Sequence, residues 1–177
     1  GILEKNGFRI LPGAEGVPTS FIAEYGAGSP VIGLIAEYDA LPGMSQEKSP
    51  VCRPRQEGAP GHACGHCALG AAVLGAALVL KDCMARQELP GTIRFYGCPA
   101  EETVEGKVLM SRDHLFDSCD AALSWHPNDI SYVWARKSVA LTGMRYTFHG
   151  TSAHAGLDPW NGRSALDAVE LMNVGAN

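Results

Sequence analysis

The sequence of 177 residues lacks any run of Lys and Arg longer than a pair, such as Arg53 and Arg55 in one segment. It has 14 Lys and Arg against 19 Asp and Glu, so its formal net charge is -5. Proteins bind nucleic acids largely by neutralising several phosphates with clustered Lys and Arg. The sequence therefore argues against nucleic acid as a partner.

The sequence also lacks a long hydrophobic run. Its longest apolar stretch is residues 68–80, which is rich in Ala and Gly, whereas a membrane-spanning helix needs about 20 apolar residues. We therefore predict no membrane partner. The N-terminal residues show no charged segment followed by an apolar core and a cleavage site. Because the first residue is Gly1, we expect the native start to lie upstream.

Six cysteines are an even number, which in a short secreted chain would indicate disulfides. With 46% apolar residues, however, this chain can form a core of one or two domains without such cross-links. Two of the cysteines, Cys64 and Cys67, alternate with His62 and His66. We therefore expect reduced thiols and a cytoplasmic location.

Alternating strand and helix patterns follow the first part of the chain, and this order predicts an α/β fold. The fold class expected is a mostly parallel sheet with helices on both faces. Residues 26–30 are expected to join the first two strands as a hairpin, and residues 44–61 to form a long surface loop. The expected elements are strands at 19–25 and 31–38, a helix at 68–82, a strand at 92–96, a helix at 105–112 and a strand at 121–125.

The pattern changes after His126-Pro127. Residues 138–149 alternate as a half-exposed strand does, and residues 163–174 form an amphipathic pattern that predicts a helix. We place a domain boundary near Ala135, which gives a metal-binding domain at 1–135 and the start of an α+β domain at 136–177. One strand and one helix cannot close a sheet, so we expect the chain to be truncated at Asn177.

Side chains that bind metals follow each of the predicted parallel strands. In open parallel sheets, ligands bind beyond the carboxyl ends of the strands. Mixed thiolate, imidazole and carboxylate donors favour borderline divalent ions, so we predict a metal site at this edge. The side chains in question are Glu37 and Asp39 after the first of these strands, His62, Cys64, His66 and Cys67 before the helix, Glu101 and Glu102 after the next strand, and His126 after the last.

The adjacent carboxylates Glu101 and Glu102 suit a hydrolytic site. One carboxylate can bind an ion while its neighbour takes a proton from a water that the ion activates. A cluster of carboxylates is costly to assemble without cations, and a pair of divalent ions would offset that cost. We therefore expect hydrolysis by a metal-activated water.

Five motifs in order resemble those of the M20 metallopeptidase family, over almost the whole chain. The most similar branch contains amidohydrolases, among them aminobenzoyl-glutamate hydrolase and the indole-acetyl amino acid hydrolases. The motifs are Asp39-Ala-Leu-Pro, Gly61-His-Ala-Cys-Gly-His66, Pro99-Ala-Glu-Glu102, His126-Pro127 and Gly150-Thr-Ser-Ala-His154-Ala.

The resemblance implies a site with two divalent metal ions, Zn or Mn, bound by Cys64, His66, Glu102 and His126. It implies that Glu101 is the general base and that Asp39 orients the site. The family's last metal ligand is a histidine near the C-terminus, which would lie beyond Asn177.

The resemblance further implies a lid or dimerisation domain after residue 135, and a homodimer in which His154 polarises the substrate carbonyl. The expected substrates are N-acyl or N-aroyl amino acids, or dipeptide-like compounds.

Cys67 departs from the resemblance, because the family usually has Asp or Asn at that position. The segment Cys64-Gly-His-Cys67 also permits a thiol-disulfide oxidoreductase, because a C-x-x-C motif before a helix can lower a thiol pKa. A third alternative is a non-catalytic domain with a structural zinc, although such sites prefer four N or S ligands. The paired glutamates favour the hydrolase.

Overall fold

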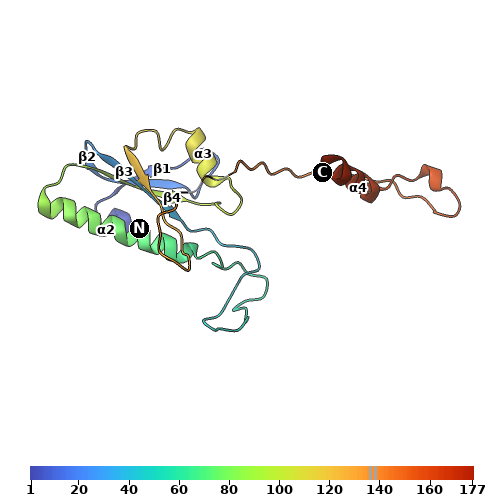
Figure 1. Ribbon diagram of the computed structural model, residues 1–177, viewed down its shortest axis with the longest axis horizontal. Helices are drawn as coiled ribbons and strands as arrows, with labels where there is room; N and C mark the ends of the chain where they lie inside the picture. Colours follow the sequence, from blue (N-terminus) through green and yellow to red (C-terminus); the bar gives the residue numbers. More distant parts are fainter. Residues whose placement is uncertain (136, 138) are drawn as a thin grey trace. The chain divides into compact units, whose positions relative to one another are not determined.

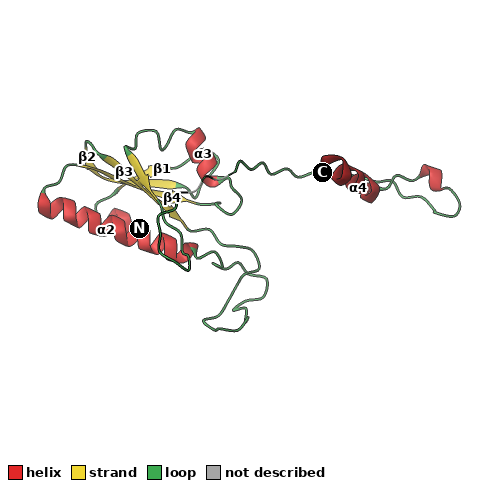
Figure 2. Cartoon of the chain, in the orientation of Figure 1, coloured by secondary structure: helices red, strands yellow, loops and turns green. Residues whose placement is uncertain are grey.

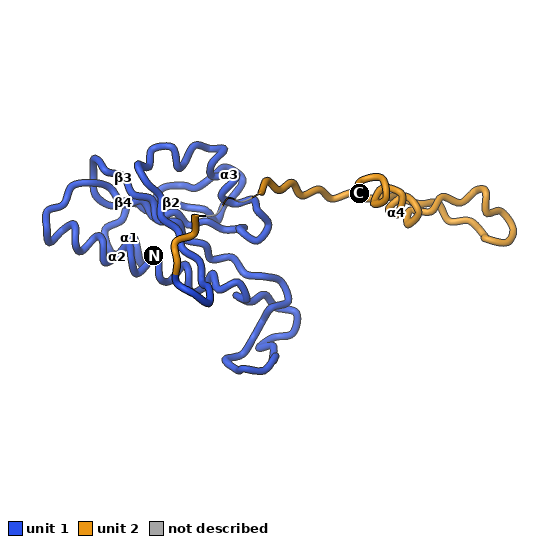
Figure 3. Tube along the Cα trace, viewed as in Figure 1, with its two compact units in different colours: residues 1–131 blue, residues 132–177 orange. Residues whose placement is uncertain are grey.

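The computed structural model describes residues 1–135, 137 and 139–177 of the chain. These residues form two compact units, 1–131 and 132–177 (Figure 3). Among the described residues, the first unit contains all five strands and three helices, and the second contains a 3-10 turn and one helix. The assignment of these units to a catalytic domain and a lid or dimerisation domain stays a prediction.

The first unit is built on a mixed five-stranded sheet (Figure 2). Strand β4 pairs in parallel with β3 and antiparallel with β2, while β5 pairs in parallel with β3 and β1 pairs antiparallel with β2. Seven of the eight β4 residues are buried, which suits its central position. The strands, in spatial order, are β1 (Arg9–Pro12), β2 (Phe21–Ala27), β4 (Gly91–Cys98), β3 (Val31–Glu37) and β5 (Ala121–Leu123).

The expected hairpin between the first two apolar runs is wrong, and this makes the sheet mixed rather than mostly parallel. Strand β4 lies between β2 and β3, so these two strands do not pair. The turn that joins them instead binds the start of β4, since Thr92 donates from its N–H to Pro30 O and from its hydroxyl to Gly28 O, both at 2.8 Å. The α/β class itself is confirmed.

Helices cover both faces of this sheet, as Figure 1 shows for α2 and α3. Successive residues of a strand point to opposite faces. Leu34 and Phe95 pack with α2 and α1 on one face, whereas Ile35 and Tyr96 pack with Met110 of α3 on the other. The helices of this unit are α1 (Ile2–Lys5), α2 (His66–Gln87) and α3 (Gly106–Arg112).

Helix α2 begins two residues earlier than expected, so that His66 and Cys67 lie in its first turn. By length and composition alone, its 22 residues are apolar enough to cross a membrane, a property that the core helices of soluble proteins share. Leu69, Val73 and Ala77 are buried against the sheet. We therefore interpret α2 as a core helix.

The second unit contains the expected helix but not the expected strand. Helix α4 (Ala165–Ala176) is preceded by Ser164, whose hydroxyl accepts a hydrogen bond from Asp167 N–H at 3.1 Å. The predicted strand began at Ser138, which lies outside the described residues, and residues 139–149 form no strand. A single strand has no ladder to join, so the alternating pattern remains exposed.

We expect Leu69→Ala to lower the free energy of unfolding by about 2–5 kcal/mol, because Leu69 is fully buried between α2 and the sheet. Urea unfolding of the purified protein measures this change. Leu80→Ala makes the same chemical change on the exposed side of α2 and should cost less than about 1 kcal/mol. Equal losses would contradict the packing of α2 on the sheet.

Candidate metal centre

The ends of β3 and β4, the residues after β5 and the start of α2 bring metal-binding side chains to one edge of the sheet. Glu37 and Cys98 are register partners at the ends of the parallel strands β3 and β4, so the residues that follow both strands leave from the same edge. We call the side chains gathered there the ligand cluster, and it consists of Glu37, Asp39, Cys64, His66, Glu101, Glu102 and His126.

His66 is the buried centre of the ligand cluster. Its Nδ1 lies 2.8 Å from Asp39 Oδ1, and Asp39 Oδ2 accepts a hydrogen bond from Glu102 N–H at 3.0 Å. Partial burial opposes ionisation of Asp39, but these two hydrogen bonds outweigh it and lower its pKa. An ionised Asp39 accepts the Nδ1 proton of His66, so Nε2 of a neutral ring carries a free lone pair.

Cys64 and His126 lie beside His66. The Cys64 Sγ is 3.3 Å from His126 Nε2, and the His66 and His126 rings meet edge to face at a centroid distance of 5.6 Å. His126 Nδ1 lies 2.9 Å from Pro127 O. Because a carbonyl only accepts, Nδ1 is the donor and Nε2 is again left as a donor atom for a cation.

Negative charge dominates the cluster. Burial raises the pKa of the Cys64 thiol, and the carboxylates of Glu102, Glu101 and Glu37 raise it further. A positive ion at this position would reverse the effect, because a metal favours the thiolate that binds it.

Two glycines allow the loops of the cluster to approach each other closely. Gly65, directly before α2, has a φ of 80°, and a Cβ there would lie 3.0 Å from Pro127 Cγ. Gly106, at the start of α3, has no room for a Cβ because the carbonyl oxygen of Pro99 occupies that space. The first contact brings His126 next to the Cys64 loop, and the second closes the turn that carries Glu101 and Glu102.

The residues present fit a divalent metal ion. Two sets of three donor atoms lie within 4.8 Å of one another, and both sets include His66. His66 Nε2 and Glu102 Oε1 are buried without a hydrogen-bond partner among the described residues, a costly arrangement that a bound cation would relieve. The two sets are Cys64, His66 and His126, and Glu37, His66 and Glu101.

The structure brings together six of the seven predicted site residues, namely Asp39, Cys64, His66, Glu101, Glu102 and His126. The seventh, His154, belongs to the second unit, where it is exposed and its Nδ1 accepts a hydrogen bond from Gly156 N–H at 3.1 Å.

Glu37 belongs to the ligand cluster but was not among the predicted ligands. Its position at the end of an apolar strand was visible in the sequence, whereas its burial was not.

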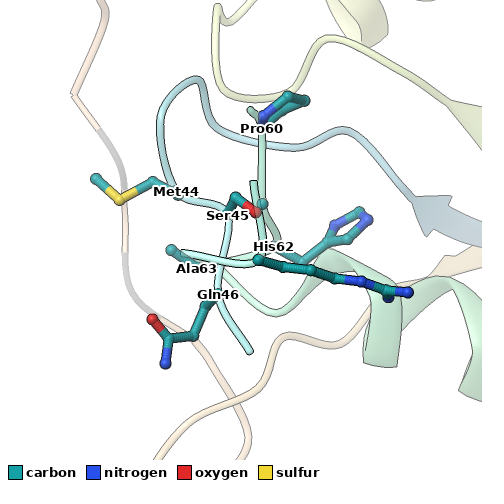
Figure 4. Close-up of a pocket in the computed structure, with 8 residues that line it drawn as sticks. Met44, Ser45, Gln46, Pro60, His62 and Ala63 are labelled. Carbon is teal, nitrogen blue, oxygen red and sulfur yellow. The ribbon is translucent and has the colours of Figure 1, made fainter. Parts of the chain in front are cut away.

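A cavity of about 590 Å³ lies in the loop before α2 (Figure 4). It is lined by Arg55 and by residues 44–46 and 60–63, and it contains no member of the ligand cluster. His62 lines this cavity rather than joining the cluster.

The fold and the ligand cluster agree with what comparison with known proteins finds. Residues 33–160 match the peptidase family M20/M25/M40, and the chain belongs to this family.

Individual relatives in the family are hydrolases. A p-aminobenzoyl-glutamate hydrolase chain from Escherichia coli (strain K12) is 44% identical over 177 residues, covering 99% of this chain and 37% of that protein. N-acetyl-L-cysteine deacetylase from Bacillus subtilis (strain 168) is 32% identical over 189 residues, covering 97% of this chain and 44% of that protein.

A solved structure gives the same result. A Bacillus subtilis protein described as a dinuclear metal binding peptidase from the M20 family is 33% identical, with a TM-score of 0.60 over 71% of this chain and 35% of that chain. The present chain thus spans less than half the length of each of these relatives.

We expect Cys64→Ser to weaken zinc binding by more than about tenfold, because the weaker oxygen donor replaces a thiolate at the centre of the cluster. Metal content after dialysis, and titration with a chromophoric chelator, measure this change. Cys67→Ala is the matched control, since Cys67 is exposed and lies outside both sets of donor atoms. Equal losses from the two variants would show that Cys64 has no special role.

Proposed function

We propose that the protein is a metal-dependent amidohydrolase that cleaves the amide bond between an acyl or aryl-acyl group and an amino acid. The observation that carries this proposal is the convergence of a thiol, two imidazoles and paired carboxylates around the unpartnered Nε2 of His66. Relatives that hydrolyse p-aminobenzoyl-glutamate and deacetylate N-acetyl-L-cysteine support the substrate class.

The residues that would hold two divalent ions, zinc or manganese, are Cys64, His66, Glu102 and His126. When bound, such ions lower the pKa of water and polarise a carbonyl group. A solved relative described as a dinuclear metal binding peptidase supports the number of ions. Asp39 holds the Nδ1 proton of His66 and so keeps Nε2 directed into the cluster.

Glu101 is the proposed general base. Its Oε2 lies 3.7 Å from His66 Nε2, and its side chain is 37% exposed, so it faces both the cluster and incoming substrate. Glu101 takes the proton from the attacking water and returns it to the leaving amine. Because water attacks the carbonyl directly, no covalent enzyme intermediate is required.

His154 is the proposed donor to the substrate oxygen. Its Nδ1 accepts a hydrogen bond from Gly156 N–H, so a neutral ring carries its proton on Nε2. This proton can stabilise the negative charge that develops on the carbonyl oxygen. We propose that the protein is a homodimer in which His154 of each protomer serves the other.

The raised pKa of Cys64 disfavours the disulfide oxidoreductase alternative. A redox-active C-x-x-C motif requires a lowered thiol pKa, whereas burial and carboxylates raise the pKa of Cys64. All six cysteines are free in the structure. A thiolate ligand needs a reducing compartment, so we place the protein in the cytoplasm.

The proposed function is tested by metal analysis of the purified protein together with hydrolysis assays on N-acyl amino acids and p-aminobenzoyl-glutamate. We expect bound zinc or manganese and hydrolysis that a chelator abolishes. A thiol reductant serves as a control for disulfide chemistry. Metal-free protein, or disulfide exchange in place of hydrolysis, would overturn the proposal.

We expect Glu101→Gln to lower turnover by at least about a hundredfold, because the amide keeps the shape of the side chain but cannot accept the proton. Bound metal should stay near the wild-type amount, and Glu102→Gln should instead lower it. Turnover and metal content measured on the same samples separate the two roles. Unchanged turnover would dismiss Glu101 as the base.

We expect His154→Ala to reduce turnover strongly without loss of metal. Glu101→Gln and His154→Ala are then mixed under conditions where protomers exchange. A hybrid dimer contains one intact composite site, so random pairing should restore up to about a quarter of wild-type activity. No recovery despite proven exchange would mean that His154 does not act across the dimer.

A further inference from the structure

Glu37 is a buried carboxylate that the proposed mechanism does not use. It ends β3, and its side chain is only 9% exposed. One oxygen, Oε1, pairs with Lys107 Nζ of α3, while Oε2 lies 3.3 Å from His66 Nε2. A buried carboxylate needs compensation for both of its oxygens, and Lys107 provides it for one.

The other oxygen of Glu37 faces acceptor atoms. His66 Nε2, Glu37 Oε2 and a Glu101 oxygen lie within 4.8 Å of one another. With its Nδ1 proton on Asp39, the His66 ring presents a lone pair at Nε2. Three acceptors that converge in a buried space repel one another unless a cation lies between them.

The geometry favours a metal ion over a proton as that cation. A protonated His66 would donate from Nε2 to Glu37, yet Nε2 makes no hydrogen bond within the described part of the chain despite the 3.3 Å approach. Two ligands about 2.0 Å from a tetrahedral zinc ion lie about 3.3 Å apart. The separation of Glu37 and His66 therefore suits two ligands of one ion.

We propose that Glu37 is an additional metal ligand, which donates Oε2 to a zinc-like divalent ion beside His66, and that Lys107 is the competing cation. The inference rests on the proposed function, since it concerns the same site. Lys107 holds Oε1 and directs Oε2 into the cluster, but its positive charge repels an incoming ion. Glu101, 3.7 Å from His66 Nε2, stays free to act as the base.

The test measures zinc affinity of the metal-stripped purified protein by competition with a chromophoric chelator. We expect Glu37→Gln to weaken zinc binding by about a hundredfold. Lys107→Met should bind zinc severalfold more tightly than wild type, because it removes the competing charge.

Glu24→Gln is the matched control, because Glu24 is another poorly exposed carboxylate of the same sheet. It pairs with Arg94 at 2.7 Å and with Arg9 at 2.5 Å, and it lies outside both sets of donor atoms. We expect its zinc affinity to equal that of wild type.

The visible spectrum of the cobalt-substituted protein provides a second measurement. Its ligand-field bands should change in Glu37→Gln and stay unchanged in Glu24→Gln, because these bands respond to the ligands of the ion. Thermal unfolding of each metal-free variant checks that it is folded.

Wild-type zinc affinity in Glu37→Gln, or an unchanged cobalt spectrum, would overturn the inference. Equal weakening by Glu37→Gln and Lys107→Met would also overturn it, since the ion pair would then be purely structural. If Glu37→Gln keeps zinc while Cys64→Ser loses it, only this inference fails. If the wild-type protein binds no zinc, manganese or cobalt, the proposed function fails as well.

Discussion

The carboxylate of Asp39 holds the site together. Its two oxygens bind His66 Nδ1 and Glu102 N–H, and thereby join the end of β3 to the start of α2 and to the turn after β4. These segments are far apart in the sequence, and each carries side chains of the ligand cluster. The same carboxylate fixes the tautomer of His66 and turns Nε2 inward, so a neutral residue at this position would loosen both the architecture and the chemistry.

The cost of this arrangement is an excess of negative charge. Asp39, Glu37, Glu101 and Glu102 converge around a buried imidazole, and Lys107 neutralises only one oxygen of Glu37. The raised pKa of Cys64 is a direct consequence of burial and of this charge. A divalent cation would satisfy the unpartnered atoms of His66 and Glu102 and would let Cys64 ionise. The fold thus stabilises a cluster whose electrostatics favour cation binding.

The sequence predicted the cluster better than the sheet. Ligand positions follow from where apolar strands end, and the strands around Leu34 and Phe95 are local patterns that the eye can find. Strand pairing is not local, so the insertion of β4 between β2 and β3 could not be read from either run. The short elements α1 and β1 were missed because tertiary packing of residues such as Leu3 and Phe8 stabilises them. Glu37 was passed over because only the fold buries it.

The second unit shows the limit of pattern-based prediction in physical terms. Residues 139–149 carry the alternation of a strand, yet Val139, Leu141 and Tyr146 are exposed and form no ladder. Alternation records which side chains need cover, whereas a strand also needs a neighbour to satisfy its backbone. Within the described residues this unit offers one helix and no sheet. The apolar pattern therefore indicates a surface to be covered, which agrees with the homodimer proposed to bring His154 to a partner's site.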